Sequence, residues 1–543
     1  MWGLGGRIRQ FLDEQCLPNL RLLWTSRQPV AWALAVVIGI AVAYAIIAFR
    51  MAIAVVQIPW IGTMSEKVAS AAAAQAPWVV FLAPVVGGLV VGLMIQHLMP
   101  SRRAEAVADV IEARVTGGAH IPWRRGLVNA VVTSISLGSG ASAGREGPAV
   151  HIGAAVASVL ADLVRLPGPT RRALFGCGVA AAVSASFNAP IAGTLFALEV
   201  ILGHYAMSAF VPIVIASVGA TVITRIHLGD FPAFTVPVYQ ITSYLEFPAF
   251  ALLGLTCGLV AVCFQFSVIT ADWVARRVDV PLWSRPVIGG AMVGAIGVAF
   301  PQVLGVGYET TDQALRHQLP LVMLLVLLVA KTAATAITMA SRFGGGVFSP
   351  ALYLGAMTGG AFGIIAASVF PQMASSEGLY AIIGMGAVTA AILGAPISTT
   401  LIVFELTGGY DVTIALLLAV SMAVAVMQAI HGRSLFHWQL GLRGLFLTEG
   451  PQRQLGRQLT VRAFMTPLAE GEAPEREPDD ATPMLTPDDT LESALRSFNA
   501  AGRSRLPVVD ASDVSRMVGW AEHVKALDAF NAALIAANIE EHR

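Results

Sequence analysis

The chain has 543 residues, of which 56% are hydrophobic and only 13% charged, and its formal net charge at pH 7 is zero. Ordinary soluble proteins carry about 25% charged residues, so the composition predicts a polytopic membrane protein and argues against a soluble enzyme. The balanced charge provides no basic arm or stripe for a nucleic acid. The four cysteines show neither metal-ligand nor disulfide spacing, so no metal site is expected.

Residues 1 to 28 form an amphipathic, arginine-containing segment without the apolar core or the cleavage site of a secretory signal. We expect this segment to be a cytoplasmic N-terminal helix, which places both termini of the chain in the cytoplasm.

From residue 29 to 446 the chain is a succession of apolar segments, several of them long enough to cross the roughly 30 Å hydrocarbon core. They lie at 29–58, 78–99, 126–137, 148–165, 172–202, 209–225, 247–275, 285–300, 318–340, 350–370, 378–393 and 396–430. Glycine or proline interrupts several of them. Interrupted helices are tolerated at membrane depth only where they are buried in protein or line a cavity, so the pattern predicts an all-α membrane domain of broken, tilted helices.

The stretch LGSGASAGREGPAVHIGAA, residues 137 to 155, places two charges inside this apolar region. Arg145 and Glu146 stand where a glycine-rich loop runs into an apolar helix, and Pro148 suits the first helical turn. An ionisable residue at membrane depth is by default a functional candidate. Because a helix N-terminus attracts an anion, we interpret the stretch as half of an anion site with an acid built into it.

An internal repeat relates two halves of the membrane domain, at about 80–225 and 285–430. The motif APIAGTLFALE at 189–199 matches APISTTLIVFE at 395–405, and PAVHIGA at 148–154 matches PALYLGA at 350–356. The offsets nearly agree, since 396 − 190 = 206 and 350 − 148 = 202, so chance similarity of alanine-rich helices is a poor explanation. Two such halves with broken helices predict a binding site near the membrane midplane between them.

Four motifs in order resemble the CLC chloride channels and proton/chloride exchangers: GREGP at 144–148, FNAP at 187–190, GVFSP at 346–350 and APIST at 395–399. The resemblance covers residues 29 to about 443 and implies a homodimer with an anion pathway in each subunit. It also implies inverted halves whose helix ends converge on the anion. By the same resemblance Glu146 gates the pathway and carries a proton. The backbone near Gly144, Arg145 and Gly147, and near Val347 and Phe348, would face the anion.

The chemistry of these residues fits that role. A carboxylate among amide dipoles occupies an anion site when charged and leaves it when neutral, so opening is expected to follow pH and anion concentration. His151 either tunes this acid or satisfies a neighbour. Arg145 is expected to be a structural partner for carboxylates or carbonyls more than a direct anion ligand. Lys331, Glu199 and Glu405 lie in apolar helices and are expected to be paired or buried at interfaces.

One position in the central part of the pathway departs from the family pattern. Members usually have a Gly-Ser-Gly-x-Pro loop about forty residues before the gating glutamate, whose serine holds the central anion, and gapless counting back from Glu146 places Glu105 at that serine. A carboxylate would repel the anion, so Glu105 is neutral, points away, or marks a rebuilt site. The alternative is that residues 102 to 106 are a solvated cytoplasmic turn and the count is off by a few residues.

Two further departures concern the proton path and the central anion. Val200 stands where exchangers usually carry an inner proton-transfer glutamate and channels typically have valine. It cannot relay a proton, although water could replace it. Phe436 stands where the family has a tyrosine whose hydroxyl touches the central anion, so the ring is kept and the donor is lost.

Beyond residue 446 the composition becomes polar. A linker at 447–460 leads to residues 461–543, which alternate short strand-like and helical patterns and resemble a single CBS module. Such modules normally pair, so binding of an adenine nucleotide is doubtful here and no other cofactor is expected. The segment is either a regulatory module or a dimer-stabilising tail, and two tails could pair across a twofold axis.

The sequence therefore predicts an all-α CLC-type membrane domain with a small α/β CBS-like cytoplasmic domain, in the inner membrane of a bacterial-type cell. The predicted function is transport of chloride or a related small anion, with proton-linked exchange gated by Glu146 preferred because that acid is intact. A passive voltage- or pH-gated channel is one alternative. A non-conducting membrane scaffold or sensor with a degenerate pore is another.

Overall fold

The computed structural model describes residues 28–166, 168–229, 241–372, 374–407, 410–446, 459–468, 483–513 and 516–542, together with Leu17 and Phe234. The expected N-terminal helix (1–28) and the linker (447–460) lie almost wholly outside these residues. The chain divides into two compact units, Met1–Gln439 and Leu440–Arg543. Each unit is described by itself.

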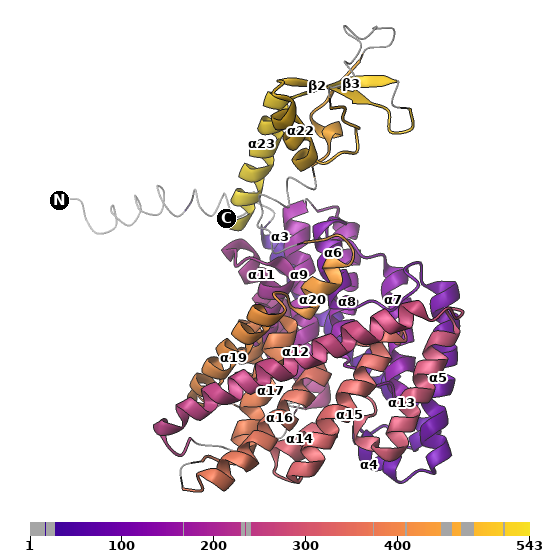
Figure 1. Cartoon of the computed structure of the whole chain (residues 1–543), viewed down its shortest axis with the longest axis vertical. Helices are drawn as coiled ribbons and strands as arrows, with labels where there is room; N and C mark the ends of the chain where they lie inside the picture. Colours follow the sequence, from indigo (N-terminus) through magenta and orange to yellow (C-terminus); the bar gives the residue numbers. More distant parts are fainter. Residues whose placement is uncertain are drawn as a thin grey trace, which may run out of the picture. The chain divides into compact units, whose positions relative to one another are not determined.

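Apolar helices at varied tilts build the first unit, and in Figure 1 the long α12 crosses it obliquely. Eight described helices are long and apolar enough to span a membrane, and the chain is a multi-pass integral membrane protein. The first half contains α3 (Gln28–Ile61), α4 (Val68–Ala73), α5 (Pro77–Leu98), α6 (Val107–Val115), α7 (Trp123–Gly138), α8 (Glu146–Val164), α9 (Gly168–Phe187), α10 (Pro190–Phe196), the π-helical turn η2 (Ala197–Leu202) and α11 (Met207–Leu228).

The second half has a matching order of elements. It contains η3 (Tyr244–Glu246), α12 (Phe247–Arg277), α13 (Ser284–Ala299), η4 (Pro301–Val303), α14 (Tyr308–Leu315), α15 (Leu321–Ala340), α16 (Phe348–Val369), α17 (Glu377–Leu393), α18 (Pro396–Thr407), α19 (Tyr410–Ile430) and α20 (Leu435–Gly441). These elements confirm the all-helical membrane domain of broken helices.

Two of the expected apolar runs are each more than one helix. Within the run at 172–202, helix α9 ends at Phe187, and the next residue, Asn188, takes a left-handed φ of 61°. Pro190 then begins α10, because its missing N–H and fixed φ suit the first position of a helix. The run at 396–430 is likewise divided into α18 and α19. Continuous hydrophobicity therefore hides breaks that the local backbone imposes.

The two halves are tied together by reciprocal helix caps. Glu405 of α18 accepts two backbone N–H groups at the start of α10, and Glu199 of η2 accepts two at the start of α18. The four bonds are 2.7 to 3.0 Å long and come from Ile191 and Ala192, and from Ile397 and Ser398. Each carboxylate thus satisfies amides that a helix start leaves open. Glu199 and Glu405 are paired, as their place in apolar helices suggests.

The close packing of helices α5 and α13 shows the same twofold relation between the two halves. A Cβ at Gly88 of α5 would meet the carbonyl oxygen of Pro286 in α13 at 2.3 Å, and a Cβ at Gly290 of α13 would meet that of Pro84 in α5 at 2.2 Å. Small residues allow such approach in membranes, where helices gain little from hydrophobic burial against each other. Equivalent helices of the two halves therefore pack on each other through equivalent glycines.

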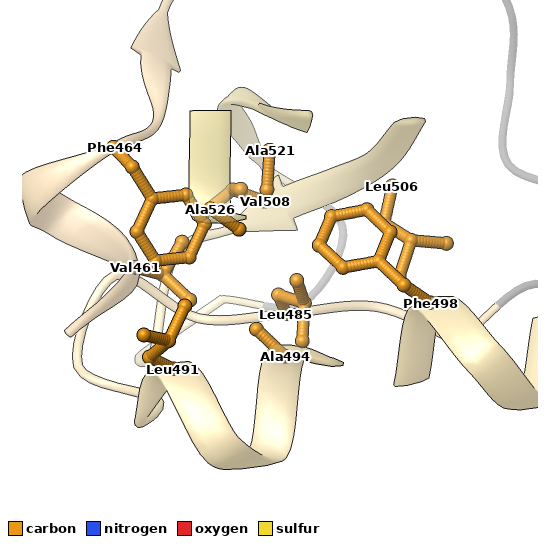
Figure 2. Packing of buried hydrophobic residues seen from close by; sticks show 10 residues of the cluster. All are labelled: Val461, Phe464, Leu485, Leu491, Ala494, Phe498, Leu506, Val508, Ala521 and Ala526. Atoms are coloured by element: carbon orange, nitrogen blue, oxygen red, sulfur yellow. The ribbon is translucent and has the colours of Figure 1, made fainter. Parts of the chain in front are cut away.

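The second unit is a small α/β structure. Strands β1 (Thr466–Pro467), β3 (Met517–Glu522) and β2 (Arg505–Val509) form an antiparallel sheet in that order, accompanied by η6 (Val461–Ala463), α22 (Leu491–Ala501) and α23 (His523–His542). Its core is shown in Figure 2, with the Phe464 ring near Val461 and the Phe498 ring near Leu506. The 461–543 segment predicted from its composition thus contains both strands and helices.

Candidate anion site at two paired helix starts

The starts of α8 and α16 are joined in the interior of the first unit. The N–H of Gly144 donates to the carbonyl of Gly346 at 2.7 Å, and the N–H of Gly346 donates to the carbonyl of Gly144 at 2.8 Å. Neither helix has a side-chain cap at its first residue. The first N–H groups of a helix have no intrahelical partner and carry the positive end of its dipole. Two such ends, one from each half of the repeat, form an anion-binding arrangement.

The carboxylate of Glu146 lies at this junction. Its side chain is buried, with 2% exposed. The Tyr308 hydroxyl donates to Oε1 and the Ser349 hydroxyl donates to Oε2, both at 2.5 Å. Tyr308 begins α14 and Ser349 lies in the first turn of α16, so the acid of the first half is held by hydroxyls of the second.

Glycines make this approach possible. A Cβ at Gly144 would lie 2.7 Å from Oε2 of Glu146 and 2.9 Å from the backbone nitrogen of Ser349. A Cβ at Gly147 would lie 3.3 Å from both Ala106 and Gly346. Ala106 immediately precedes α6, so the start of a third helix also approaches the junction.

Val347 and Phe348 are buried at the start of α16, where the sequence places them beside the anion. The Phe348 ring packs against Phe187 at a centroid distance of 5.0 Å and against Phe196 at 6.1 Å. These two partners end α9 and α10. The backbone of the site is therefore fixed from behind by an aromatic cluster.

Arg145 points to a carboxylate outside the junction. Its Nη1 donates to Oε1 of Glu66 at 2.7 Å, and Nη2 of Arg50 donates to the same oxygen at 2.8 Å. Its guanidinium carbon lies 4.7 Å from the centre of the Tyr308 ring. The Coulombic field of Arg145, opposed by partial burial and assisted by Arg50, lowers the pKa of Glu66 to about 2.

Glu105 is buried in a polar cluster, which excludes the alternative that it belongs to a solvated turn. Its side chain is 1% exposed. Nη2 of Arg125 lies 2.5 Å from Oε1, and Nε2 of His151 lies 2.9 Å from Oε2. Burial opposes ionisation of Glu105, yet His151 and Arg125 outweigh it and lower the pKa to about 2. The carboxylate is therefore charged, not neutral, and is directed to Arg125 and His151.

Asn129 completes this cluster. Its side-chain carbonyl accepts the N–H of Glu105 at 2.8 Å, and its amide donates to the Glu105 carbonyl at 2.8 Å. The same amide lies 3.3 Å from Nδ1 of His151. Of the two roles considered for His151, the contacts fit that of satisfying a neighbour.

The remaining predicted positions take no part in the hydrogen bonds and ion pairs described above. Val200 lies half-buried in η2. Phe436 is buried in α20 with 4% exposed. Lys331 of α15 is fully buried and donates to the carbonyls of Val303 and Gly305 at 3.0 and 2.9 Å.

Sequence reasoning missed four members of the site region, namely Tyr308, Ser349, Glu66 and Arg50. Ser349 stands inside a quoted motif, GVFSP, and its hydroxyl could have been noticed. Arg50 lies inside the apolar segment 29–58, so its charge could also have been noticed. Tyr308 and Glu66 carry no local signal. Within the described residues, this arrangement defines a class of protein: a multi-pass membrane protein with two related halves, whose helix starts meet beside a buried carboxylate.

A family model described as voltage gated chloride channel matches residues 87–428, which is more than half of the chain. The chain belongs to the voltage-gated chloride channel family, the CLC family.

Named relatives span a wide range of organisms. A putative chloride channel protein, ClcB-like, from Ralstonia nicotianae is 33% identical over 391 residues, which cover 71% of this chain and 91% of the relative. Chloride channel protein CLC-f of Arabidopsis thaliana is 30% identical over 428 residues, which cover 73% of this chain and 54% of the relative.

Solved structures agree with the fold. A slow cyanobacterial Cl⁻/H⁺ antiporter superimposes with a TM-score of 0.68 at 23% identity, covering 77% of this chain and 98% of that one. A eukaryotic CLC transporter superimposes with a TM-score of 0.66 at 19% identity, covering 92% and 99%. At these identities the likeness concerns the fold alone.

Proposed function

We propose that this protein moves chloride, or a related small anion, across the membrane in exchange for protons, with Glu146 as gate and proton carrier. The single observation that carries the proposal is the Glu146 carboxylate at the paired starts of α8 and α16, held by Tyr308 and Ser349. Membership of the family and the likeness of the chain to named chloride channels support the choice of anion.

The chemistry of the gate follows from its charge. Ionised Glu146 fills the anion site with its own oxygens and accepts two hydroxyl hydrogen bonds. Protonation removes the charge that the helix dipoles attract, so the side chain leaves and a mobile anion takes its place. In each cycle the protonated Glu146 side chain leaves the anion site and one anion enters it. The anion leaves again when the ionised side chain returns.

A passive channel is the second candidate, and Val200 is the observation that favours it. This half-buried valine in η2 offers no proton acceptor at the position where exchangers usually carry a glutamate. Exchange then requires water to carry the proton past Val200. A channel requires no such path.

The test is ion flux from liposomes containing the purified full-length protein, with a chloride gradient imposed at equal pH on both sides. Exchange predicts that the chloride gradient drives protons across the membrane and builds a pH difference, and Glu146→Gln abolishes that movement while anion flux persists. Asp279→Asn, which removes an exposed acid far along the chain, serves as the matched control and leaves proton movement unchanged.

Other outcomes assign the other functions. Chloride flux without proton movement establishes the channel and gives Val200 its simplest meaning. Absence of flux with chloride, nitrate, bicarbonate and fluoride, in wild type and in Glu146→Gln alike, overturns transport and favours the membrane scaffold.

The proposal includes the assembly and the location that the family resemblance implies. We expect a homodimer with one pathway in each subunit, in the inner membrane of a bacterial-type cell, with both termini cytoplasmic. The distribution of arginines supports this orientation, because Arg102 and Arg103 lie in the connection before α6 and Arg124 and Arg125 lie in the first turn of α7. The cytoplasmic ends of membrane helices and their short loops are rich in Lys and Arg.

A further inference from the structure

A second group of charges lies between α3, the α3–α4 connection and the start of α8. Arg50 and Arg145 both donate to the same oxygen of Glu66, at 2.8 and 2.7 Å. Two guanidinium groups therefore share one carboxylate, and the cluster carries a net positive charge. Glu66 is half-exposed, whereas the Arg145 side chain is 8% exposed.

Two cavities border this cluster on different sides. One of about 190 Å³ is lined by Arg50, Glu66 and Arg145 together with Ser186 and Asn188. The other, of about 350 Å³, is lined by the same three residues together with Gln57 and Tyr308. A single water requires only roughly 10–15 Å³ of such space, so either cavity has room for a hydrated small anion.

One donor in the cluster is left without a partner among the described residues. The Nε–H of Arg145 is buried and makes no hydrogen bond there. An unsatisfied donor on a buried cation costs free energy, and the residue lines both cavities. Guanidinium groups bind anions through paired N–H donors, so the Nε–H of Arg145 is suited to donate a hydrogen bond to an anion and is not suited to bind a cation.

We propose that Arg50 and Arg145 form a second anion site, in the vestibule beside Glu146, which takes a small inorganic anion and for which Glu66 is a built-in competitor. Anion binding at this site does not depend on the proposed transport function. Only its role of supplying anions to the transport pathway rests on that function. Glu66 holds both guanidinium groups when no anion is present, and an entering anion replaces its shared oxygen.

The site is connected to the gate through one side chain. Tyr308 is in contact with the Arg145 guanidinium through its ring and donates its hydroxyl to Glu146. By the arginine distribution the cluster faces outward, since α5 runs from the α4 side of the unit to the connection that contains Arg102 and Arg103. The vestibule site therefore lies on the external approach to Glu146.

Calorimetric titration of chloride into the purified full-length protein, in buffer that contains only large organic anions, tests the site. Glu66→Gln removes the competing charge and leaves both guanidinium groups in place. We expect chloride to bind at least tenfold more tightly to this variant than to wild type. The double variant Arg50→Gln/Glu66→Gln should lose that gain, and Arg50→Lys/Glu66→Gln should keep most of it.

Lys67→Gln is the matched control, because it removes a neighbouring exposed positive charge that belongs to neither cavity, and it should bind chloride as wild type does. Unchanged affinity in Glu66→Gln, with its melting temperature intact, overturns the site. Persistence of the gain without Arg50 also overturns it. Because the titration measures binding, it gives an answer even if the liposomes show no flux.

Discussion

Two hydroxyl groups hold the carboxylate of Glu146 by hydrogen bonds, and no described residue forms an ion pair with it. Hydrogen bonds to a charged group contribute about 1.5–3 kcal/mol each, which is strong enough to keep the acid in place and weak enough for one proton to release it. In the proposed function, Tyr308 and Ser349 therefore determine the behaviour of the gate as much as the acid itself does.

Removal of one hydroxyl should make the gate easier to open. In Ser349→Ala the ionised carboxylate loses one donor, so less acid is needed to displace it. We expect the pH of half-maximal anion flux to rise by about 1 to 2 units, since 1.36 kcal/mol corresponds to one pH unit. Flux measured against external pH gives the value.

Ser368→Ala is a suitable control on the same helix, because that hydroxyl donates only to the Ile365 carbonyl. A pH profile that stays with wild type in Ser349→Ala, or shifts to lower pH, would contradict the role given to the hydroxyl.

The contacts of Glu105 with Arg125 and His151 indicate that this residue stabilises the fold. In Glu105→Gln, Arg125 and the buried His151 lose their carboxylate, and we expect a loss of about 3 kcal/mol, the lower end for a broken buried pair, since Arg125 is 40% exposed. Thermal inactivation of the purified variant measures this loss, and Glu112→Gln on the adjacent helix α6 is the control.

The pH dependence of that loss has a definite sign. The folded-state pKa of Glu105, about 2, lies below the ordinary value of 4.5. Its contribution is therefore fully present above pH 4.5 and disappears as the pH falls toward 2. The difference in stability between wild type and Glu105→Gln should shrink over this window, and a constant difference would show that the charge is not responsible.

At the scale of elements, the crossed caps make α10 and α18 dependent on each other's half. Glu199→Ala uncaps α18 and Glu405→Ala uncaps α10, and each should cost about 1 to 2 kcal/mol, the range for loss of a helix cap. The two costs should be similar because the caps are equivalent. Melting temperatures of both variants provide the comparison, and the Gln variants, which keep an acceptor oxygen, should lose less.

Local sequence indicated where the apolar helices lie, but it did not separate α9 from α10 or α18 from α19, and it was insufficient for the contacts between helices. Pro190 and Pro396 mark helix starts, and the repeated motif shows the two halves, because these signals occupy neighbouring residues. The partners of Glu146 lie 162 and 203 residues away, where no periodicity reaches. Counting placed Glu105 just before α6, but only the fold shows that Arg125 and His151 compensate its charge.

At the scale of the whole molecule, the second unit has a hydrophobic core of its own. Phe498 of α22 is 1% exposed within that core, and Phe498→Ala should cost about 3–5 kcal/mol. Because the units are separately compact, we expect limited proteolysis of Phe498→Ala to remove residues beyond 459, which resist in wild type, and to leave the membrane unit intact. Arg496→Ala, on the exposed side of the same helix, should resist as wild type does.

The two halves meet where Gly144 pairs with Gly346, but their chemistry there differs, and this matters for experiments on vesicles. The repeat offset makes Phe348 the counterpart of Glu146, since 348 − 146 = 202 and 350 − 148 = 202. Backbones that are nearly interchangeable thus present an acid from one half and an aromatic ring from the other. Under the gating that we propose for Glu146, vesicles that hold the protein in both orientations should contain two distinguishable populations. Acid added to one side alone should then open only the molecules whose vestibule faces that side.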